Sequence, residues 1–354
     1  MDKDTITEWL TDDNTCFLIG AGCSHCAGKP LMAELTEKVV EKLTPKGKQM
    51  IDILNGPDAD SKPTIEDVTN QLLRLQYVAA QRKDKKIDGW DLSKIEEEIQ
   101  LIQKSIVEVI GTNWKSSDKH KIFLERLIQN SKSVRDIFLL NYDTVIEASI
   151  EDLKLPYVDG FRGTENAYFD AKSYDDKNME KRFNIYKLHG SINWVRASDE
   201  IVRRKPLSTI TDEEYRHVIY PAEQKYVQTQ YGVYEVLQKL FRDRLKKDMP
   251  NNRLVVLGYS FSDDHITTAI EDGILSPGSN LTVFAFIGGN VSEARKEILK
   301  SMAEKCDNRF NVFVGQSEYI GTGLNKEECE TNMKTIDFSR FENIVDFLAG
   351  HKHE

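Results

Sequence analysis

The stretch Cys16-Phe17-Leu18-Ile19-Gly20-Ala21-Gly22-Cys23-Ser24 decides the fold of this chain. Its apolar first half predicts a buried strand, and its glycines predict a tight turn into a helix. Such a unit can hold a phosphate, because glycine lets the backbone approach the ligand and a helix N-terminus offers free N–H groups. The dinucleotide fingerprint Gly-x-Gly-x-x-Gly is incomplete, since His25 occupies its last position, so a hydride-transferring enzyme is disfavoured. Taken alone, the stretch fits a structural turn nearly as well.

Further short apolar runs along the chain also predict buried strands. Most of them are continuous rather than alternating, which is typical of a parallel sheet covered by helices on both faces. Helical patterns lie between them. We therefore expect an α/β fold of the Rossmann-like, doubly wound type, with a mostly parallel six-stranded sheet. The predicted strands are Cys16–Gly20, Asp136–Leu140, Ile185–Leu188, Leu254–Gly258, Leu281–Phe286 and Asn311–Val314.

The first two predicted strands are separated by more than a hundred residues, whose pattern is mostly helical. Ile65, Val68 and Leu72 recur at helical spacing, for example, after a capping residue at Thr64. This separation is too long for a simple crossover between strands of one sheet. We expect residues 31–130 to form a mostly helical lobe, inserted in a nucleotide-binding core made of residues 1–30 and 131–354.

The composition limits the partners that the chain can have. Its 354 residues include 48 Lys and Arg against 58 Asp and Glu, a net charge of −10. This balance argues against broad, sequence-independent nucleic-acid binding, which depends on cationic side chains. The five cysteines are an odd, scattered set, the first residues have no signal-peptide character, and the apolar runs are strand-length. We expect a cytoplasmic protein without a membrane anchor.

Three more polar motifs follow predicted strands directly. Asn141-Tyr142-Asp143 follows the second strand, Lys187-Leu188-His189-Gly190 spans the end of the third, and Gly258-Tyr259-Ser260 begins a longer motif after the fourth. In open α/β sheets, ligands bind beyond the carboxyl ends of the strands. Four such motifs at four consecutive strand ends therefore predict one site.

This ordered set of motifs resembles the sirtuin superfamily, and within it the bacterial sirtuin-like NADases of antiphage defence. The resemblance extends over residues 16–265. It implies that the GAGCS loop contacts the phosphates of NAD, that the histidine before glycine is catalytic, and that the Gly-x-Ser motif faces the adenosine.

Two departures separate this chain from the protein-deacylating sirtuins. Those proteins carry a zinc ribbon with two Cys-x-x-Cys pairs, whereas no cysteine lies between Cys26 and Cys306 here. Gly28-Lys29-Pro30-Leu31-Met32 also replaces the Pro-Asp-Phe-Arg-like segment of deacylases. Both departures favour the NAD-consuming branch that the chain resembles, and this resemblance implies NAD as the substrate, with no metal.

The resemblance and the chemistry of glycosidic cleavage assign roles to single residues. Because nicotinamide in NAD is already cationic, it leaves without a second carboxylic acid to protonate it. Asn141 is expected to orient water and sugar, and His189 to act as general base. The expected binding residues are Gly20, Ala21, Gly22 and Ser24 at the diphosphate, Asp143 at the ribose, and Gly258, Ser260 and Asp264 on the adenosine side.

Simpler roles stay open for several of these residues. His189 could be a hydrogen-bonded packing residue, and Asn141 could cap the helix that follows it. Ser260 could equally cap a helix. Cys23, His25 and Cys26 lack the further ligands that a structural zinc needs, so small side chains packed beside the loop are the favoured interpretation.

The predicted function is NAD glycohydrolysis to nicotinamide and ADP-ribose, which depletes NAD as an effector of antiphage defence by abortive infection. A protein deacylase or ADP-ribosyl transferase is the first alternative, and a non-catalytic module that binds NAD or ADP-ribose is the second. An unregulated enzyme of this kind would kill its host. We therefore expect homo-oligomers and, by analogy, a complex with a hexameric DNA-translocase ATPase of the HerA family.

Overall fold

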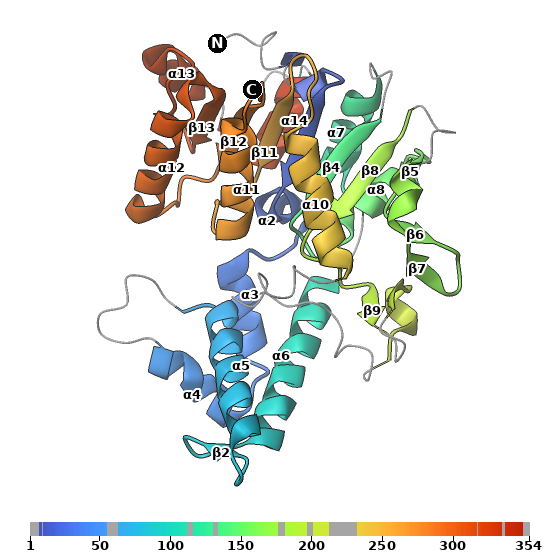
Figure 1. Cartoon of the computed structure of the whole chain (residues 1–354), viewed down its shortest axis with the longest axis vertical. Coiled ribbons are helices and arrows are strands. Elements are labelled where there is room, and N and C mark those ends of the chain that lie inside the picture. Colours follow the sequence, from blue (N-terminus) through green and yellow to red (C-terminus); the bar gives the residue numbers. More distant parts are fainter. Residues whose placement is uncertain are drawn as a thin grey trace.

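The structure is a computed structural model, shown in Figure 1, with a sheet-containing part above and a group of helices below. It describes residues 7–8, 10–54, 63–111, 116–129, 134–175, 181–196, 201–211, 232–316, 318–334 and 337–349.

An eight-stranded sheet forms the centre of the upper part, in the order β14-β13-β12-β11-β1-β4-β8-β5. All neighbouring strands are parallel except β14, which runs antiparallel to β13. The doubly wound, mostly parallel fold is confirmed, and all six predicted strands are present. The two additional edge strands are too short to leave an apolar run in the sequence. The strands are β1 (Thr15–Ile19), β4 (Arg135–Leu139), β5 (Tyr157–Val158), β8 (Phe183–Lys187), β11 (Arg253–Leu257), β12 (Thr282–Ile287), β13 (Phe310–Val314) and β14 (Glu318–Ile320).

Helices cover both faces of this sheet, which explains why its central strands carry apolar residues on both faces. In β1, Cys16 and Leu18 point into one core, and Phe17 and Ile19 point into the other. The first core is closed by α10 (Val233–Leu245), α11 (Asp264–Leu275) and α12 (Glu293–Lys305). The second is closed by α7 (Asp118–Gln129), α8 (Val145–Asp152), α13 (Lys326–Met333) and α14 (Phe341–Ala349).

A third core holds the helical lobe together, below the sheet in Figure 1. The longest helix pair of the lobe, α5 and α6, packs through the predicted stripe that includes Val68 and Leu72. Thr64 and Asp67 form a capping box at the start of α5. The lobe contains α3 (Met32–Val40), α4 (Pro45–Leu54), α5 (Ile65–Gln81), α6 (Leu92–Gly111) and a hairpin of β2 (Lys86–Ile87) and β3 (Trp90–Asp91).

The domain boundaries stay a prediction. The α7 helix falls inside the range 31–130 assigned to the lobe, but its apolar residues Phe123 and Leu127 pack in the second core against the sheet. Lobe packing therefore ends with α6.

A small antiparallel sheet lies beside β8, in the order β6-β7-β10-β9. Its Phe161 and Trp194 belong to the first core, with ring centroids 5.0 Å apart. The strands are β6 (Phe161–Arg162), β7 (Ala167–Phe169), β9 (Trp194–Arg196) and β10 (Val202–Arg204).

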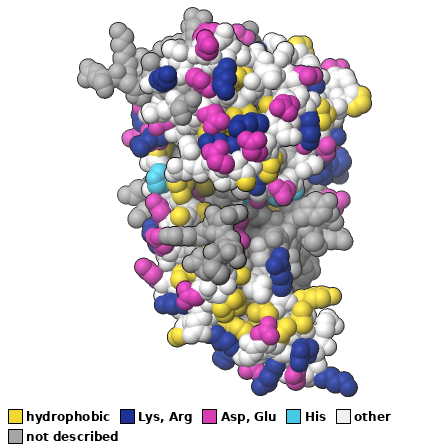
Figure 2. All heavy atoms as spheres, turned by 90° about the vertical axis from the view of Figure 1, so that its left-hand side faces the viewer, with side chains coloured by type: hydrophobic (Ala, Val, Ile, Leu, Met, Phe, Trp, Pro, Cys, Tyr) yellow, Lys and Arg dark blue, Asp and Glu magenta, His cyan; other side chains and the backbone are white. Residues whose placement is uncertain are grey.

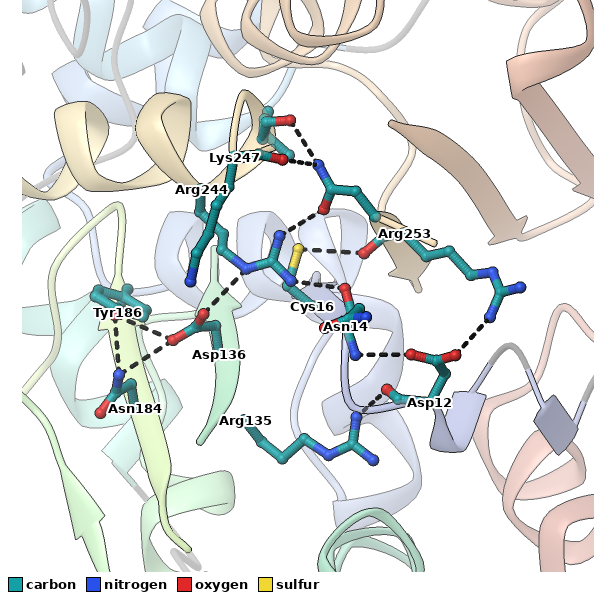
Figure 3. Close-up of polar contacts among 12 residues, drawn as sticks. Asp12, Asn14, Cys16, Arg135, Asp136, Asn184, Tyr186, Arg244, Lys247 and Arg253 are labelled. Atoms are coloured by element: carbon teal, nitrogen blue, oxygen red, sulfur yellow. Dashed lines mark hydrogen bonds and ion pairs between the residues drawn. The ribbon is translucent and has the colours of Figure 1, made fainter. Parts of the chain in front are cut away.

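A buried polar network joins strands and helices at the amino ends of the parallel strands (Figure 3). The Arg244 guanidinium of α10 pairs with Asp136 of β4 at 3.1 Å and donates to Asn252 Oδ1 at 2.6 Å and to the Asn14 carbonyl at 2.7 Å. Asp136 also accepts a hydrogen bond from the Tyr186 hydroxyl at 3.1 Å. This network fixes α10 to the end of the sheet opposite the predicted site.

The outer surface carries charges of both signs. On the face shown in Figure 2, Lys and Arg side chains are interspersed with Asp and Glu side chains, and hydrophobic side chains gather over the lower, helical part. That face has no broad basic area, in agreement with the charge of −10.

Candidate functional site

The four sequence motifs lie at one edge of the sheet. Their strands are neighbours, in the order β11-β1-β4-β8, and all four are parallel, so their carboxyl ends meet. The chain passes from β1 outward to β4 and β8, and then returns to β11 on the other side of β1. This reversal is a topological switch point, where open α/β sheets bind their ligands.

The glycine loop after β1 packs tightly against the loop after β11. Gly20 N–H donates to the Leu257 carbonyl at 2.9 Å, and Gly22 N–H donates to the Gly258 carbonyl at 3.0 Å. A Cβ atom on Gly20 would lie 2.5 Å from the Gly258 carbonyl oxygen. Gly258 itself has φ +61°, a conformation that favours glycine. These glycines therefore serve the contact between two loops.

The helix that follows the loop is shorter than a phosphate-binding unit of the usual kind. It is the single turn α2 (Ala21–Ser24), continued by the 3-10 turn His25–Ala27. A helix macrodipole needs several aligned turns, so α2 contributes little of it. Attraction of an anion would depend on other groups.

A cavity of about 390 Å³ opens above these strand ends. Eight of the ten predicted site residues line it: Gly20, Ala21, Ser24, Asn141, Asp143, His189, Gly258 and Ser260. The structure thus brings together residues that are up to 240 positions apart in the chain, from Gly20 to Ser260.

The other two predicted residues lie outside the described lining of the cavity. Gly22 sits behind the loop, against Gly258. Asp264 is the first residue of α11, where its exposed carboxylate lies 3.5 Å from Arg295. Its neighbour Asp263 lines the cavity instead.

The Asn141 carboxamide is buried, with 6% of its surface exposed. Its Nδ2 donates to the Ser24 hydroxyl at 2.8 Å. Its Oδ1 has no hydrogen-bond partner among the described residues. Because a buried acceptor without a partner is costly, this oxygen is suited to receive a donor from water or a ligand.

Asn141 does not cap the following helix. The N-cap residue of α8 is Thr144, and the side chain that bonds the first turn is that of Asp143, whose Oδ1 accepts from the Val145 N–H at 3.0 Å. Ser260 does not cap α11 either, since the residue before its first turn is Asp263. The simpler alternatives for these two side chains are therefore wrong.

His189 lines the cavity with 4% of its surface exposed. Its ring lies near two others, with centroids 5.5 Å from His265 and 6.5 Å from Tyr142. His265 belongs to α11 and Tyr142 follows β4, so aromatic rings from two other segments lie near the imidazole. Its role as general base stays a prediction.

Lys29 is a site residue that the sequence reasoning missed. It lines the cavity with 5% of its surface exposed, and its Nζ donates to the Ile110 carbonyl at the end of α6 at 2.8 Å. Burial lowers the pKa of its ammonium group, and the Asp143 carboxylate opposes that shift. A lysine between Gly28 and Pro30, directly after the glycine loop, was the signal that could have identified it.

The helical lobe forms one wall of the cavity. Met32, Leu35 and Ile110 supply apolar surface, and Thr64 and Glu66 supply polar groups at the start of α5. Lobe and sheet therefore share the site, which no single sequence motif could show.

The cysteines beside the loop lie in surroundings that disfavour the thiolate form. Burial raises the pKa of Cys23 well above its usual range and that of Cys26 to about 11. Within the part of the chain that the structure describes, no three His, Cys, Asp or Glu side chains are grouped to hold a metal ion. None of the described helices combines the length and apolar character that crossing a membrane requires.

Residues 135–306 match the family model described as SIR2-like domain. No curated relative matches the sequence significantly. Two similar solved structures are a mutant Sir2 homologue in complex with ADP ribose and a Sir2 homologue in complex with NAD. The first has TM-score 0.37 and 11% identity, covering 100% of both chains. The second has TM-score 0.39 and 12% identity, covering 87% of this chain and 96% of the other.

The matched region begins at β4 and ends after α12, so it contains Asn141, His189 and Gly258 but not the glycine loop. The match covers 172 of the 354 residues, just under half of the chain, and it shows a likeness to the SIR2-like domain over this region.

Proposed function

We propose that the protein is an NAD glycohydrolase that cleaves the nicotinamide–ribose bond and releases nicotinamide and ADP-ribose. One observation carries the proposal: Asn141 and His189 line the same cavity as the glycine loop and Gly258. The SIR2-like domain and the NAD and ADP-ribose named with the Sir2 homologues make NAD the substrate to test first.

In the proposed reaction, the chain's own residues place NAD and a water molecule. Lys29 supplies a positive charge near the glycine loop, where the diphosphate would lie. The free Oδ1 of Asn141 accepts a hydrogen bond from the attacking water or a ribose hydroxyl. His189 takes a proton as the water attacks the anomeric carbon, while nicotinamide leaves with the electron pair of the glycosidic bond.

A nicotinamide-release assay on purified protein tests this proposal. His189→Ala is expected to reduce cleavage at least about 100-fold, the usual contribution of a general base. Asn141→Ala should also reduce it, because the buried acceptor is lost. His25→Ala is the matched control, since His25 is exposed and outside the described cavity lining. Full turnover by the His189 variant would contradict the mechanism.

Two further assays separate the alternatives. An acyl-lysine peptide that is deacylated, without ADP-ribose release from NAD alone, would favour a deacylase. Binding of NAD without consumption in any preparation would favour a non-catalytic binding module.

We further propose that the activity serves antiphage defence in the cytoplasm, within homo-oligomers and with a HerA-like hexameric DNA-translocase ATPase. The resemblance to bacterial defence NADases supports this role, and so does the need to control an enzyme that depletes NAD. Phage challenge of cells carrying the protein and its partner, with and without His189→Ala, tests it. A lone monomer that is both active and tightly regulated would contradict the assembly.

A further inference from the structure

A second cavity, of about 380 Å³, lies between α8, the end of β8 and the small sheet. Its described lining shares no residue with that of the first cavity, although Thr144 of the second follows Asp143 of the first. Its volume is in the usual range of small-molecule sites, about 300–1,000 Å³. Nothing in the proposed NAD chemistry uses it.

Three acidic and three basic side chains line this second cavity, and four of these six form two ion pairs. Lys187 Nζ lies 3.1 Å from Glu147 Oε1, and the Arg204 guanidinium contacts the Asp159 carboxylate. Burial raises the pKa of Glu147, and Lys187 opposes that shift. Because these opposite charges balance, the cavity has no large preference for a charged ligand.

Two buried acceptors of the second cavity are nevertheless left over. Glu147 Oε2 and Asn193 Oδ1 have no hydrogen-bond partner among the described residues. Both residues line the cavity, and the described lining leaves no buried side-chain nitrogen in the same condition. A ligand that satisfies these two oxygens must therefore carry hydrogen-bond donors rather than acceptors.

Part of the remaining wall is aromatic and apolar, and the rest carries the polar side chains of Thr144, Glu151, Thr164, Lys205 and Ser208. Trp194, 4% exposed, is held edge-on against Phe161, and Leu207 lines the cavity beside it. A rigid aromatic wall with a few converging acceptors favours a flat ring that carries N–H groups.

We propose that this second cavity binds a neutral, amino-substituted aromatic base of the nucleobase class, whose N–H groups donate to Glu147 and Asn193. This inference is independent of NAD cleavage and concerns a different site.

Calorimetric titration of the full chain with adenine tests the proposal, in the presence of saturating ADP-ribose to occupy the first cavity. Purine, which has the same ring without the exocyclic amine, is the matched ligand. We expect adenine to bind at least about tenfold more tightly than purine, the effect of one hydrogen bond to a charged group. Equal affinity, or no heat with adenine because the cavity holds only water, would overturn the proposal.

Variants locate the site. Ala148→Phe fills the cavity from α8, where Ala148 is half-buried, without removing a charge, and is expected to abolish adenine binding. Glu147→Gln should weaken it about tenfold. Glu151→Gln is the control: this exposed carboxylate one turn further on also lines the cavity, but it already accepts from the Tyr157 hydroxyl at 2.6 Å. Unchanged adenine binding by a folded Ala148→Phe variant would overturn the proposal even if Glu147→Gln failed to fold.

The adenine-binding experiment and the nicotinamide-release assay can fail independently of each other. Loss of nicotinamide release with intact adenine binding would contradict NAD cleavage alone. Absence of adenine binding with intact nicotinamide release would contradict the second site alone.

Discussion

The Asn141 amide nitrogen donates a 2.8 Å hydrogen bond to the Ser24 hydroxyl, across 117 residues of sequence. This bond ties the turn after β4 to the end of the glycine loop. It also orients the carboxamide, because with Nδ2 engaged the unpartnered Oδ1 has a fixed direction. Ser24 is thus a positioning residue for Asn141.

Replacing Ser24 by Ala tests that role. The Asn141 amide would lose its acceptor and its fixed orientation, so we expect kcat of NAD cleavage to fall about tenfold, equivalent to about 1.4 kcal/mol. KM should change less, since the change affects orientation more than binding. Ser276→Ala, on the exposed end of α11, is the control for a simple loss of hydroxyl. An unchanged kcat would show that the hydrogen bond does not position the carboxamide.

Lys29 gives a second prediction, for affinity. Lys29→Met roughly keeps the length of the side chain but removes its positive charge, which is what would attract a diphosphate. We expect KM for NAD to rise about tenfold or more, with a smaller change of kcat. Stability should change little, because the lost hydrogen bond to Ile110 is offset by relief from burying an ammonium group. Lys42→Met is the control, because this exposed lysine forms an ion pair with Glu108 of α6, the helix whose Ile110 carbonyl accepts from Lys29. An unaltered KM would exclude Lys29 from substrate binding.

The central strands and the motifs at their carboxyl ends could be predicted from the sequence, because both depend on local patterns. Continuous apolar runs identify the central parallel strands, and each strand end is marked by a glycine or an amide-bearing residue. Such signals need no knowledge of distant contacts. The order of the motifs was therefore sufficient to place Asn141 and His189 at one edge.

The features that could not be predicted depend on the exact residue at which an element begins, or on contacts between residues far apart in the sequence. Asp264 and Asp263 are adjacent, and which one faces the cavity depends on where α11 begins, because each helical residue turns the side chain by about 100°. The contact between Lys29 and the end of α6 joins residues 81 positions apart. The edge strand β5 has two residues, too few to form a pattern.

The polar network of Arg244 predicts a non-additive effect on stability. Arg244→Met would leave the Asp136 carboxylate without its charged partner, so we expect the free energy of unfolding to fall by about 3–5 kcal/mol. Adding Asp136→Leu should recover part of that loss, since no uncompensated charge then stays buried. Urea unfolding of the two single variants and the double variant measures the coupling. Simple additivity would mean that the two groups do not act as a pair.

His120 predicts how stability changes with pH. Its ring is fully buried beside Phe341, with centroids 4.6 Å apart, and both of its nitrogens lack a hydrogen-bond partner among the described residues. Burial lowers its pKa from 6.5 to about 4, although the Asp143 carboxylate opposes the shift. Between these values the unfolded chain binds the proton and the folded chain does not. Stability is therefore complete above pH 6.5 and is lost as the pH falls toward 4, by about 3 kcal/mol in total.

His120→Leu should remove this part of the acid sensitivity. The substitution breaks no hydrogen bond within the described residues and keeps the position apolar, so we expect a flatter plot of unfolding free energy against pH between 6.5 and 4. Phe341→Leu is the matched control: it loosens the same contact without removing a titrating group, and should lower stability equally at each pH. Identical slopes for the wild-type chain and the His120 variant would show that another group is responsible for the loss of stability in acid.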